Sequence, residues 1–249
     1  MLKFKISAAS SVGCVRGNNE DMLLIGNSTL RTGELDAELE ATPNNRFIIA
    51  LADGMGGHNS GEVASNDVLT NLQFFYNDLP NGLATTDFNE MIYEWLASIN
   101  NILEAKGRSD ERYRDMGTTL VAIAYYEGEF YWMNCGDSRY YSMNSKGELH
   151  QISTDHSLNN LLGKREHSNV ITNCIGGGCK TSYIDLVRCT PDIVAGGTLL
   201  LCSDGLTDMV SDDTIQQMLA DGCEASALCR VAEDAGGFDN VSAVIIRVS

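Results

Sequence analysis

A run of short apolar segments near the middle of the chain restricts the fold more than any other feature. The segments span residues 118–126, 129–134 and 139–143. Glu127-Gly128 and Gly136-Asp137 separate them, and both dipeptides suit tight turns. Strands joined by such short connections pair antiparallel, because a parallel pair needs a long crossover. The run therefore predicts a largely antiparallel sheet.

Other segments carry the spacing of helices and of further strands. Apolar side chains recur at helical spacing in residues 62–77 and 88–105, which predicts two amphipathic helices. Two shorter helices are expected at residues 212–220 and 224–234, with Ser211 as an N-terminal cap. Further strands are expected at residues 47–52, 149–152, 182–189, 198–202 and 241–248.

The order of these elements defines the fold class. Strands come first, then two helices, a strand meander and finally mixed elements, so alternating βαβ units are absent from the pattern. We expect an α+β protein with one domain over residues 1–249. The number of strands suits two packed sheets with helices outside. The polar segment 28–45 is predicted to be a loop or a hairpin excursion, serving either a partner or no specific role.

Charge and apolar patterning exclude several classes of protein. The chain has 17 Lys and Arg against 34 Asp and Glu, giving a formal charge of −17. Such a chain repels nucleic acid and anionic membrane surfaces. No apolar run approaches the ~20 residues of a membrane span, and the N-terminus lacks a signal-peptide pattern. We therefore expect a cytoplasmic protein without membrane insertion or nucleic-acid partners.

Eight cysteines leave two interpretations open. Disulfides are one, but no two cysteines form C-x-x-C and several lie in apolar runs. Buried thiols that pack as small hydrophobic groups are the interpretation we favour in a reducing compartment.

Four acid–glycine turns point to a cation site. The acids are Asp53, Asp137, Asp204 and Asp239, and each lies beside glycine or in a turn, next to an apolar strand. A single such turn is most simply a turn. Four carboxylates that converge at one end of a sheet pair would repel each other, and divalent cations would relieve that repulsion. All-oxygen ligation selects Mg²⁺, Mn²⁺ or Ca²⁺.

Six motifs in order give a specific resemblance. They are Arg16 with NED (19–21), ADGMGGH (52–58), MGTT (116–119), GDSR (136–139), LCSDGL (201–206) and GGFDN (236–240). In this order they resemble the metal-dependent protein phosphatases of type 2C, the PPM family, and most closely its compact bacterial Ser/Thr branch. The resemblance spans Arg16 to Asn240 and implies a four-layer α-β-β-α sandwich of two mainly antiparallel sheets flanked by helices.

The resemblance also implies a binuclear Mn²⁺ or Mg²⁺ centre, with a weaker third ion. Asp53 would bridge two metals and the Gly54 carbonyl would bind one of them. Asp204 and Asp239 would ligate the other, and Asp137 would help to hold the third ion.

Further residues are assigned by the same resemblance. Glu20, Asp21 and Asn240 would lie just behind the ligands, with the two acids orienting metal-bound waters. Arg16 would grip the substrate phosphate with two parallel hydrogen bonds, which lysine cannot match.

The activity implied is hydrolysis of phosphoserine and phosphothreonine in phosphoproteins. A hydroxide bridging the two metals would attack phosphorus and release inorganic phosphate. The enzyme would be a monomer that opposes a bacterial Ser/Thr kinase, itself among the substrates. Two alternatives stay open: a catalytically silent relative that binds phosphoproteins, and a structural or Ca²⁺-binding acidic domain. The latter lacks EF-hand spacing and leaves Arg16 unexplained.

The sequence departs from the family pattern at two places. Met55 stands where many eukaryotic relatives have histidine, so either a metal-bound water or His58 would protonate the leaving group. The flap between His156 and Gly178 is short, and Asn173 stands where arginine is common. Within it, Lys164 and Arg165 either contact a phosphopeptide or are ordinary solvated charges.

Overall fold

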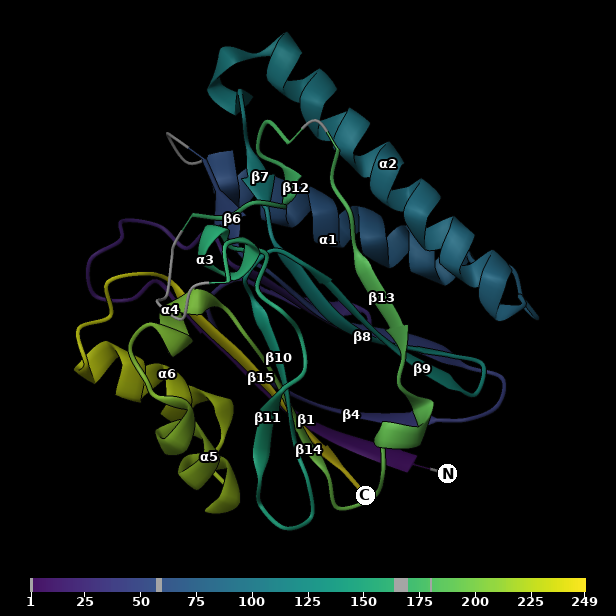
Figure 1. Ribbon diagram of the computed structural model, residues 1–249, viewed down its shortest axis with the longest axis vertical. Coiled ribbons are helices and arrows are strands. Elements are labelled where there is room, and N and C mark those ends of the chain that lie inside the picture. The colour runs from purple at the N-terminus through teal and green to yellow at the C-terminus, as the bar shows by residue number, and fades with distance from the viewer. Residues whose placement is uncertain (1, 57–59, 164–169, 180) are drawn as a thin grey trace.

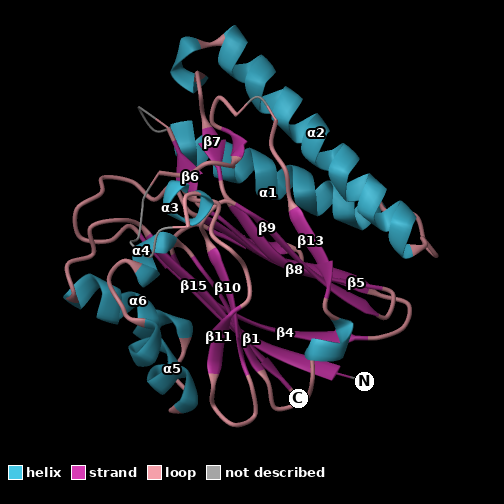
Figure 2. Ribbon diagram, viewed as in Figure 1, coloured by secondary structure: helices cyan, strands magenta, loops and turns pink. Residues whose placement is uncertain are grey.

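The computed structural model describes residues 2–56, 60–163, 170–179 and 181–249. Two six-stranded antiparallel sheets pack face to face, with helices on both outer sides, as Figures 1 and 2 show. The first sheet has the order β11 (Leu149–Gln151), β10 (Arg139–Met143), β14 (Thr198–Cys202), β15 (Val241–Val248), β1 (Leu2–Ser11) and β4 (Gly33–Ala41). The second has the order β13 (Asp185–Arg188), β9 (Glu129–Cys135), β8 (Leu120–Tyr126), β5 (Arg46–Ala52), β2 (Met22–Ile25) and β3 (Ser28–Leu30).

Three apolar layers hold the sandwich together. The middle layer lies between the two sheets and includes Phe4, Ile49 and Leu201. Helices α1 (Ser60–Asp78) and α2 (Thr85–Ser109) cover the outer side of the second sheet. Helices α5 (Asp212–Ala220) and α6 (Ala225–Asp234) cover the outer side of the first. The predicted α+β sandwich is therefore confirmed.

Strand β5 shows why an uninterrupted apolar sequence is needed at the centre of such a fold. Ile48 and Ala50 face the α1–α2 layer, whereas Ile49 and Leu51 face the opposite sheet. Both faces are buried, so no position in the strand can be polar without a buried partner. The strand ends at Ala52, and Asp53 follows it at the rim of the sandwich.

A small third sheet lies at one end of the sandwich. It contains β12 (Ile175–Gly176), β7 (Gly117–Thr118) and β6 (Gly54–Met55), in that order. Figure 1 shows this sheet, with the short helices α3 (Leu158–Leu161) and α4 (Asp204–Thr207), at the end away from the chain termini.

The segment 28–45 differs from its prediction. It is neither a loop nor a simple hairpin, because β3 pairs with β2 in one sheet and β4 pairs with β1 in the other. Leu35, Ala37 and Leu39 of β4 pack against the inter-sheet core, while the acidic residues between them are exposed. The strict alternation of GELDAELEA, which is typical of a half-buried strand, was the available signal.

The structure also refines the predicted bounds of one strand and the predicted helix caps. The strand expected at 182–189 is confined to β13, and the Ser157 hydroxyl caps α3. The Ser211 cap is confirmed, because its hydroxyl accepts a hydrogen bond from the Thr214 N–H.

Among the cysteines, Cys14 is exposed. Cys179 and Cys223 are half-buried, and the other five are buried as expected. Within the described ranges, no helix has the length and hydropathy needed to cross a bilayer.

We expect Leu201→Ala to lower the free energy of unfolding by about 2–5 kcal/mol, because Leu201 is fully buried between the sheets. Leu162→Ala removes the same atoms from a side chain that is 57% exposed, and should change stability by less than about 0.5 kcal/mol. Chemical denaturation of both variants measures the difference. Equal effects would contradict the assignment of the inter-sheet core.

Candidate metal centre

The four predicted acid–glycine turns lie at the ends of central strands. Asp53 follows β5, Asp137 lies between β9 and β10, Asp204 follows β14 and begins α4, and Asp239 precedes β15. The pKa of Asp53 shows that these acids lie close together. Removal from water raises the pKa of Asp53 well above its ordinary value, and the carboxylates of Asp21, Asp204, Asp137 and Asp239 raise it further.

Two threonines hold the backbone of Asp53. The Thr118 hydroxyl and the Thr119 N–H both donate to the Asp53 carbonyl oxygen, each at 2.8 Å. The Asp53 N–H donates in return to the Thr119 hydroxyl at 3.0 Å. That hydroxyl also lies 2.7 Å from the Ser138 hydroxyl, next to Asp137. The MGTT motif therefore links the turns that carry Asp53 and Asp137.

Gly54 touches the first turn of α1 backbone to backbone. A Cβ atom on Gly54 would lie 2.2 Å from the Gly61 carbonyl oxygen, and one on Gly61 would lie 2.6 Å from the Gly54 carbonyl carbon. Neither position can carry a larger residue without moving the helix. The Gly54 N–H also donates to the Glu20 carbonyl at 3.2 Å. These contacts fix the carbonyl of Gly54, which is the predicted backbone ligand.

Two buried carboxyls lack hydrogen-bond partners on one or both oxygens. Both oxygens of Asp137 and the Oδ1 atom of Asp21 are without a partner. The Oδ2 atom of Asp21 accepts from the Ser203 hydroxyl at 2.9 Å. Burial, with repulsion from Asp204, raises the pKa of both carboxyls to about 7. Such oxygens fit a hard divalent cation, which would satisfy the free lone pairs and neutralise the charge.

The ligand set itself stays a prediction. No group of three or more His, Cys, Asp or Glu side chains in the described part of the chain is arranged to close on one ion. Of the predicted ligands, Asp239 binds Arg16, with Nη2 and Oδ2 2.6 Å apart. Both side chains are partly exposed at the rim. The structure thus places the predicted phosphate-binding arginine beside a predicted metal ligand.

Asn240 organises the loop that carries Arg16 and Glu20. Its side-chain oxygen accepts from the Glu20 N–H at 2.9 Å, and its amide donates to the carbonyls of Val12 and Asn18 at 3.0 and 2.9 Å. Burial raises the pKa of Glu20. Glu20, Asp21 and Asn240 therefore lie next to the acid–glycine turns, and their role behind the ligands stays a prediction.

Arg31 is a positioning residue that sequence reasoning missed. Its Nη1 atom donates to the carbonyls of Asn19 and Asp21 at 2.9 and 3.1 Å, and Nη2 donates to the Glu62 carbonyl at 2.9 Å. It thereby ties the acidic loop to the start of α1. Arg31 lies in the polar 28–45 segment, where no spacing or neighbouring motif distinguishes it.

His156 supports the turn before Asp137. The Gly136 N–H donates to the Nδ1 atom at 3.1 Å, and the His156 N–H donates to the Gly136 carbonyl at 2.9 Å. Its Nε2 atom lies 3.1 Å from Oδ2 of Asp185. Accepting at Nδ1 places the proton on Nε2, so the imidazole donates to Asp185.

In the predicted flap between His156 and Gly178, Asn173 is the residue that stands where arginine is common. Asn173 is buried, and its amide nitrogen lies 2.8 Å from His156 Nδ1 and donates to the Tyr183 carbonyl at 2.8 Å, so it faces the interior and not a substrate. His58, Lys164 and Arg165 lie outside the described residues.

The raised pKa values predict how stability depends on pH. A carboxyl with a higher pKa in the folded state holds more protons when folded, so its contribution is greatest below its ordinary value of 3.8 and is lost as pH rises through about 7. With EDTA present, the thermal unfolding temperature should fall between pH 5.5 and 8. Asp137→Asn should flatten this fall.

The control is Asp36→Asn on the exposed face of β4, which removes one charge without removing a buried carboxyl. It should leave the slope of the unfolding temperature against pH close to that of the wild type. Equal slopes for all three proteins would contradict the burial argument.

Comparison with known proteins identifies relatives over the whole length. The model of the Protein phosphatase 2C family matches residues 25–234. Protein phosphatase PhpP of Streptococcus pneumoniae is 33% identical over 265 residues, covering 98% of each chain. Serine/threonine protein phosphatase PstP of Mycobacterium tuberculosis is 32% identical, covering 99% of this chain and 45% of its own length.

Solved structures of serine/threonine phosphatases also resemble this chain in fold. The serine/threonine phosphatase of S. agalactiae superimposes with a TM-score of 0.82 at 27% identity, covering 99% of this chain and 100% of that one. The catalytic domain of PstP, solved with two manganese ions, has a TM-score of 0.75 at 31% identity and covers 100% and 99%. The chain therefore belongs to the protein phosphatase 2C family and is an enzyme of the protein-serine/threonine phosphatase class.

Proposed function

We propose that this chain hydrolyses phosphoserine and phosphothreonine in phosphoproteins at a centre of two Mn²⁺ or Mg²⁺ ions, with a weaker third. Asp53 would bridge the two ions, the Gly54 carbonyl would bind one, Asp204 and Asp239 would bind the other, and Asp137 would help to hold the third. Residues 1–249 would act as one catalytic domain.

The observation that carries this proposal is the electrostatic cost of the carboxylate cluster. Asp53 has a raised pKa because four other carboxylates add to its burial, and Asp137 is buried with no partner on either oxygen. Such an arrangement destabilises the metal-free protein, so it is consistent with selection for cation binding. When bound, the cations supply a water of lowered pKa and neutralise charge on the phosphoryl oxygens.

The chain's own residues contribute binding and orientation. Arg16 presents a planar guanidinium at the rim, 2.6 Å from Asp239, where a phosphate beside the ion would meet it. Transfer of Arg16 from the Asp239 carboxylate to a phosphate would exchange one charge-assisted hydrogen bond for a bidentate pair. Glu20 and Asp21, held by Asn240 and Arg31, would orient waters at the centre.

The cellular role follows from the substrate class. We infer a cytoplasmic monomer that opposes a Ser/Thr kinase and counts that kinase among its substrates. The names of PhpP, PstP and the S. agalactiae enzyme support a phosphoprotein substrate. A catalytically silent relative is the competing proposal.

Metal-dependent turnover is the first test. Wild-type protein should hydrolyse p-nitrophenyl phosphate and a phosphothreonine peptide only when Mn²⁺ or Mg²⁺ is added. Asp53→Asn should abolish this hydrolysis, and Asp204→Asn or Asp239→Asn should lower kcat through loss of metal. Asp36→Asn is the matched control and should keep wild-type activity. Metal binding without turnover in the wild type would favour the silent relative.

Arg16 is tested by separating KM from kcat. Arg16→Ala should raise KM for the phosphopeptide by about 10-fold or more, because a hydrogen bond to a charged group is worth about 1.5–3 kcal/mol. Arg16→Lys should recover part of this loss, since it restores the charge but not the paired geometry. Calorimetric titration with Mn²⁺ should show retained metal binding. An unchanged KM in both variants would contradict phosphate binding by Arg16.

A further inference from the structure

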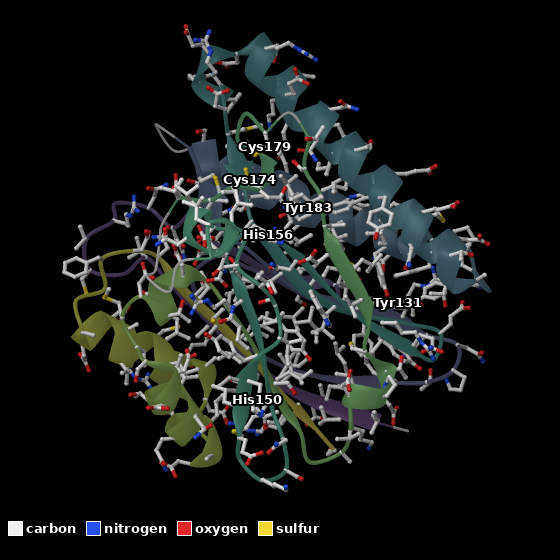
Figure 3. The ribbon with its side chains drawn as sticks, viewed as in Figure 1. Tyr131, His150, His156, Cys174, Cys179 and Tyr183 are labelled. Carbon is white, nitrogen blue, oxygen red and sulfur yellow. The ribbon has the colours of Figure 1, made fainter. Side chains whose placement is uncertain are left out.

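Two thiols that are separated in the sequence by four residues lie in contact. The sulfur atoms of Cys174 and Cys179 are 3.3 Å apart, and Figure 3 shows both residues at the end of the sandwich near β7 and β12. Cys174 is buried, whereas Cys179 is half-exposed. A disulfide has an S–S distance of about 2.05 Å, so only a small approach separates this pair from a covalent bond.

Three consecutive glycines make this contact possible. Gly176, Gly177 and Gly178 all have positive φ angles, of 76°, 60° and 72°. A Cβ atom on Gly177 would lie 2.6 Å from the Cys174 sulfur. The turn therefore requires glycine to bring the two sulfur atoms together, and a side chain at Gly177 would displace Cys174.

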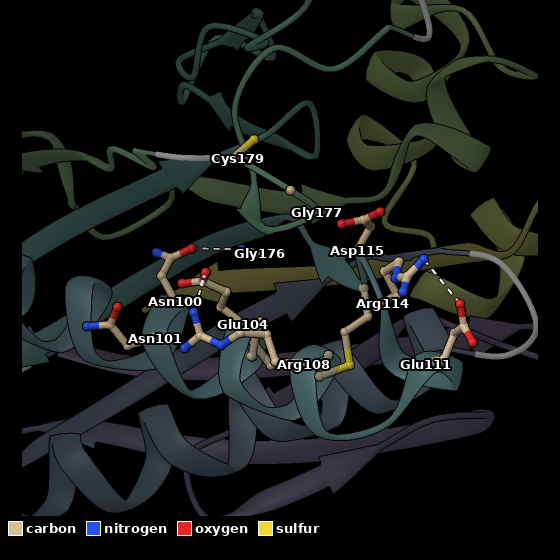
Figure 4. A pocket seen from close by; sticks show the side chains of 14 residues that line it. Asn100, Asn101, Glu104, Arg108, Glu111, Arg114, Asp115, Gly176, Gly177 and Cys179 are labelled. Carbon is tan, nitrogen blue, oxygen red and sulfur yellow. Dashed lines mark hydrogen bonds and ion pairs between the residues drawn. The ribbon is translucent and has the colours of Figure 1, made fainter.

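The pair is accessible from a groove. Cys179 and the three glycines line a groove of about 710 Å³, whose other walls are the C-terminal part of α2, Glu111 and residues 114–116. Figure 4 shows Cys179 at its edge, with Asn100 accepting a hydrogen bond from the Gly176 N–H at 2.8 Å. A small disulfide compound can thus reach Cys179 first and Cys174 only through it.

We propose that Cys174 and Cys179 form a modification site that undergoes thiol–disulfide exchange with a low-molecular-weight disulfide, and that the resulting intrachain disulfide weakens the metal centre. The Cys179 thiolate attacks one sulfur of the small disulfide and expels one small thiolate, leaving a mixed disulfide. Cys174 then loses its proton, attacks the Cys179 sulfur and expels the second thiolate. Two protein thiols are oxidised and one small disulfide is reduced to two thiols.

The chemistry of the two positions fits these roles. Burial, and the hydrogen bond to Cys179, raise the pKa of the Cys174 thiol. Cys174 is therefore unreactive toward solvent but is held against the sulfur that it must attack. A disulfide between Cys174 and Cys179 would close a loop with only four residues between the two cysteines. A loop this short removes little conformational entropy from the unfolded chain, so the disulfide would gain little stability from its closure. Because it would also be half-exposed, we expect thiols to reduce it readily.

The link to the metal centre is a path of paired strands, and this part rests on the proposed function. Ile175 and Gly176 of β12 pair with Thr118 and Gly117 of β7, which pair in turn with Gly54 and Met55 of β6. The Gly177 N–H also donates to the Met116 carbonyl at 2.8 Å. Movement of the glycine turn therefore acts on the strand that holds Gly54 and, through Thr118, on Asp53.

The test equilibrates the full chain in buffers with increasing ratios of oxidised to reduced glutathione, followed by alkylation and trypsin digestion. Cleavage after Arg165 and Lys180 releases residues 166–180, which contain Cys174 and Cys179 and no other cysteine. With oxidation, this peptide should carry no alkyl group and should be two hydrogen atoms lighter than the unalkylated dithiol peptide. Dithiothreitol should reverse the change.

Single substitutions identify the order of attack. Cys174→Ser should stop at a glutathione adduct on Cys179, and Cys179→Ser should form no intrachain disulfide. Cys223→Ser is the matched control, because Cys223 is also half-buried but lies between α5 and α6, and it should behave as the wild type. A 166–180 peptide that stays doubly alkylated in the oxidised wild type would overturn the proposal.

A second measurement tests the effect on the metal centre. The Mn²⁺ concentration that gives half-maximal hydrolysis should rise on oxidation of the wild type and stay constant in Cys179→Ser. Disulfide formation with an unchanged Mn²⁺ requirement would overturn the regulatory part of the proposal. Absence of hydrolysis in reduced protein as well would count against the proposed function alone, since the peptide masses report the thiol chemistry independently.

Discussion

Repulsion among carboxylates that are packed away from water is the constraint on which the rest of this structure depends. Asp53 lies where four other carboxylates raise its pKa, and each would be more stable if it moved toward solvent. They stay because they are attached to the ends of central strands that are buried on both faces. The free energy that keeps the acids together therefore comes from apolar burial in the three layers of the sandwich.

Backbone contacts then convert this proximity into a defined site. Gly54 and Gly61 touch without side chains between them, which fixes β6 against α1. Gly205 packs in the same manner against Asn240, because a Cβ atom there would lie 2.0 Å from the Asn240 carbonyl oxygen. Asn240 in turn holds the loop of Glu20. Glycine is needed at these positions because only a residue without a side chain permits such close approach.

The small third sheet connects features that are otherwise separate. Its strand β7 bears Thr118, which hydrogen-bonds to Asp53, and its strand β12 begins at Ile175, next to the Cys174 thiol. A two-residue strand has few hydrogen bonds of its own, so its position depends on its neighbours. The same sheet therefore contacts both the predicted ligand Asp53 and the glycine turn that carries the two thiols.

Local sequence determined the larger elements, because their signals are local. Periodicity predicted α1, α2, α5 and α6 to within a few residues, and the ordered motifs indicated the family. The alternation in β4 was equally local, but the density of acidic residues suggested a loop.

Tertiary structure alone decided which distant groups meet. No pattern in the sequence indicates that Arg31 binds the carbonyls of Asn19 and Asp21, because an arginine in a polar segment has many possible partners. The contact between Cys174 and Cys179 likewise depends on three successive positive φ angles, which glycine permits but does not require. The residues and their order define the chemistry available to this chain, whereas packing of the two sheets sets the distances between the groups that carry it.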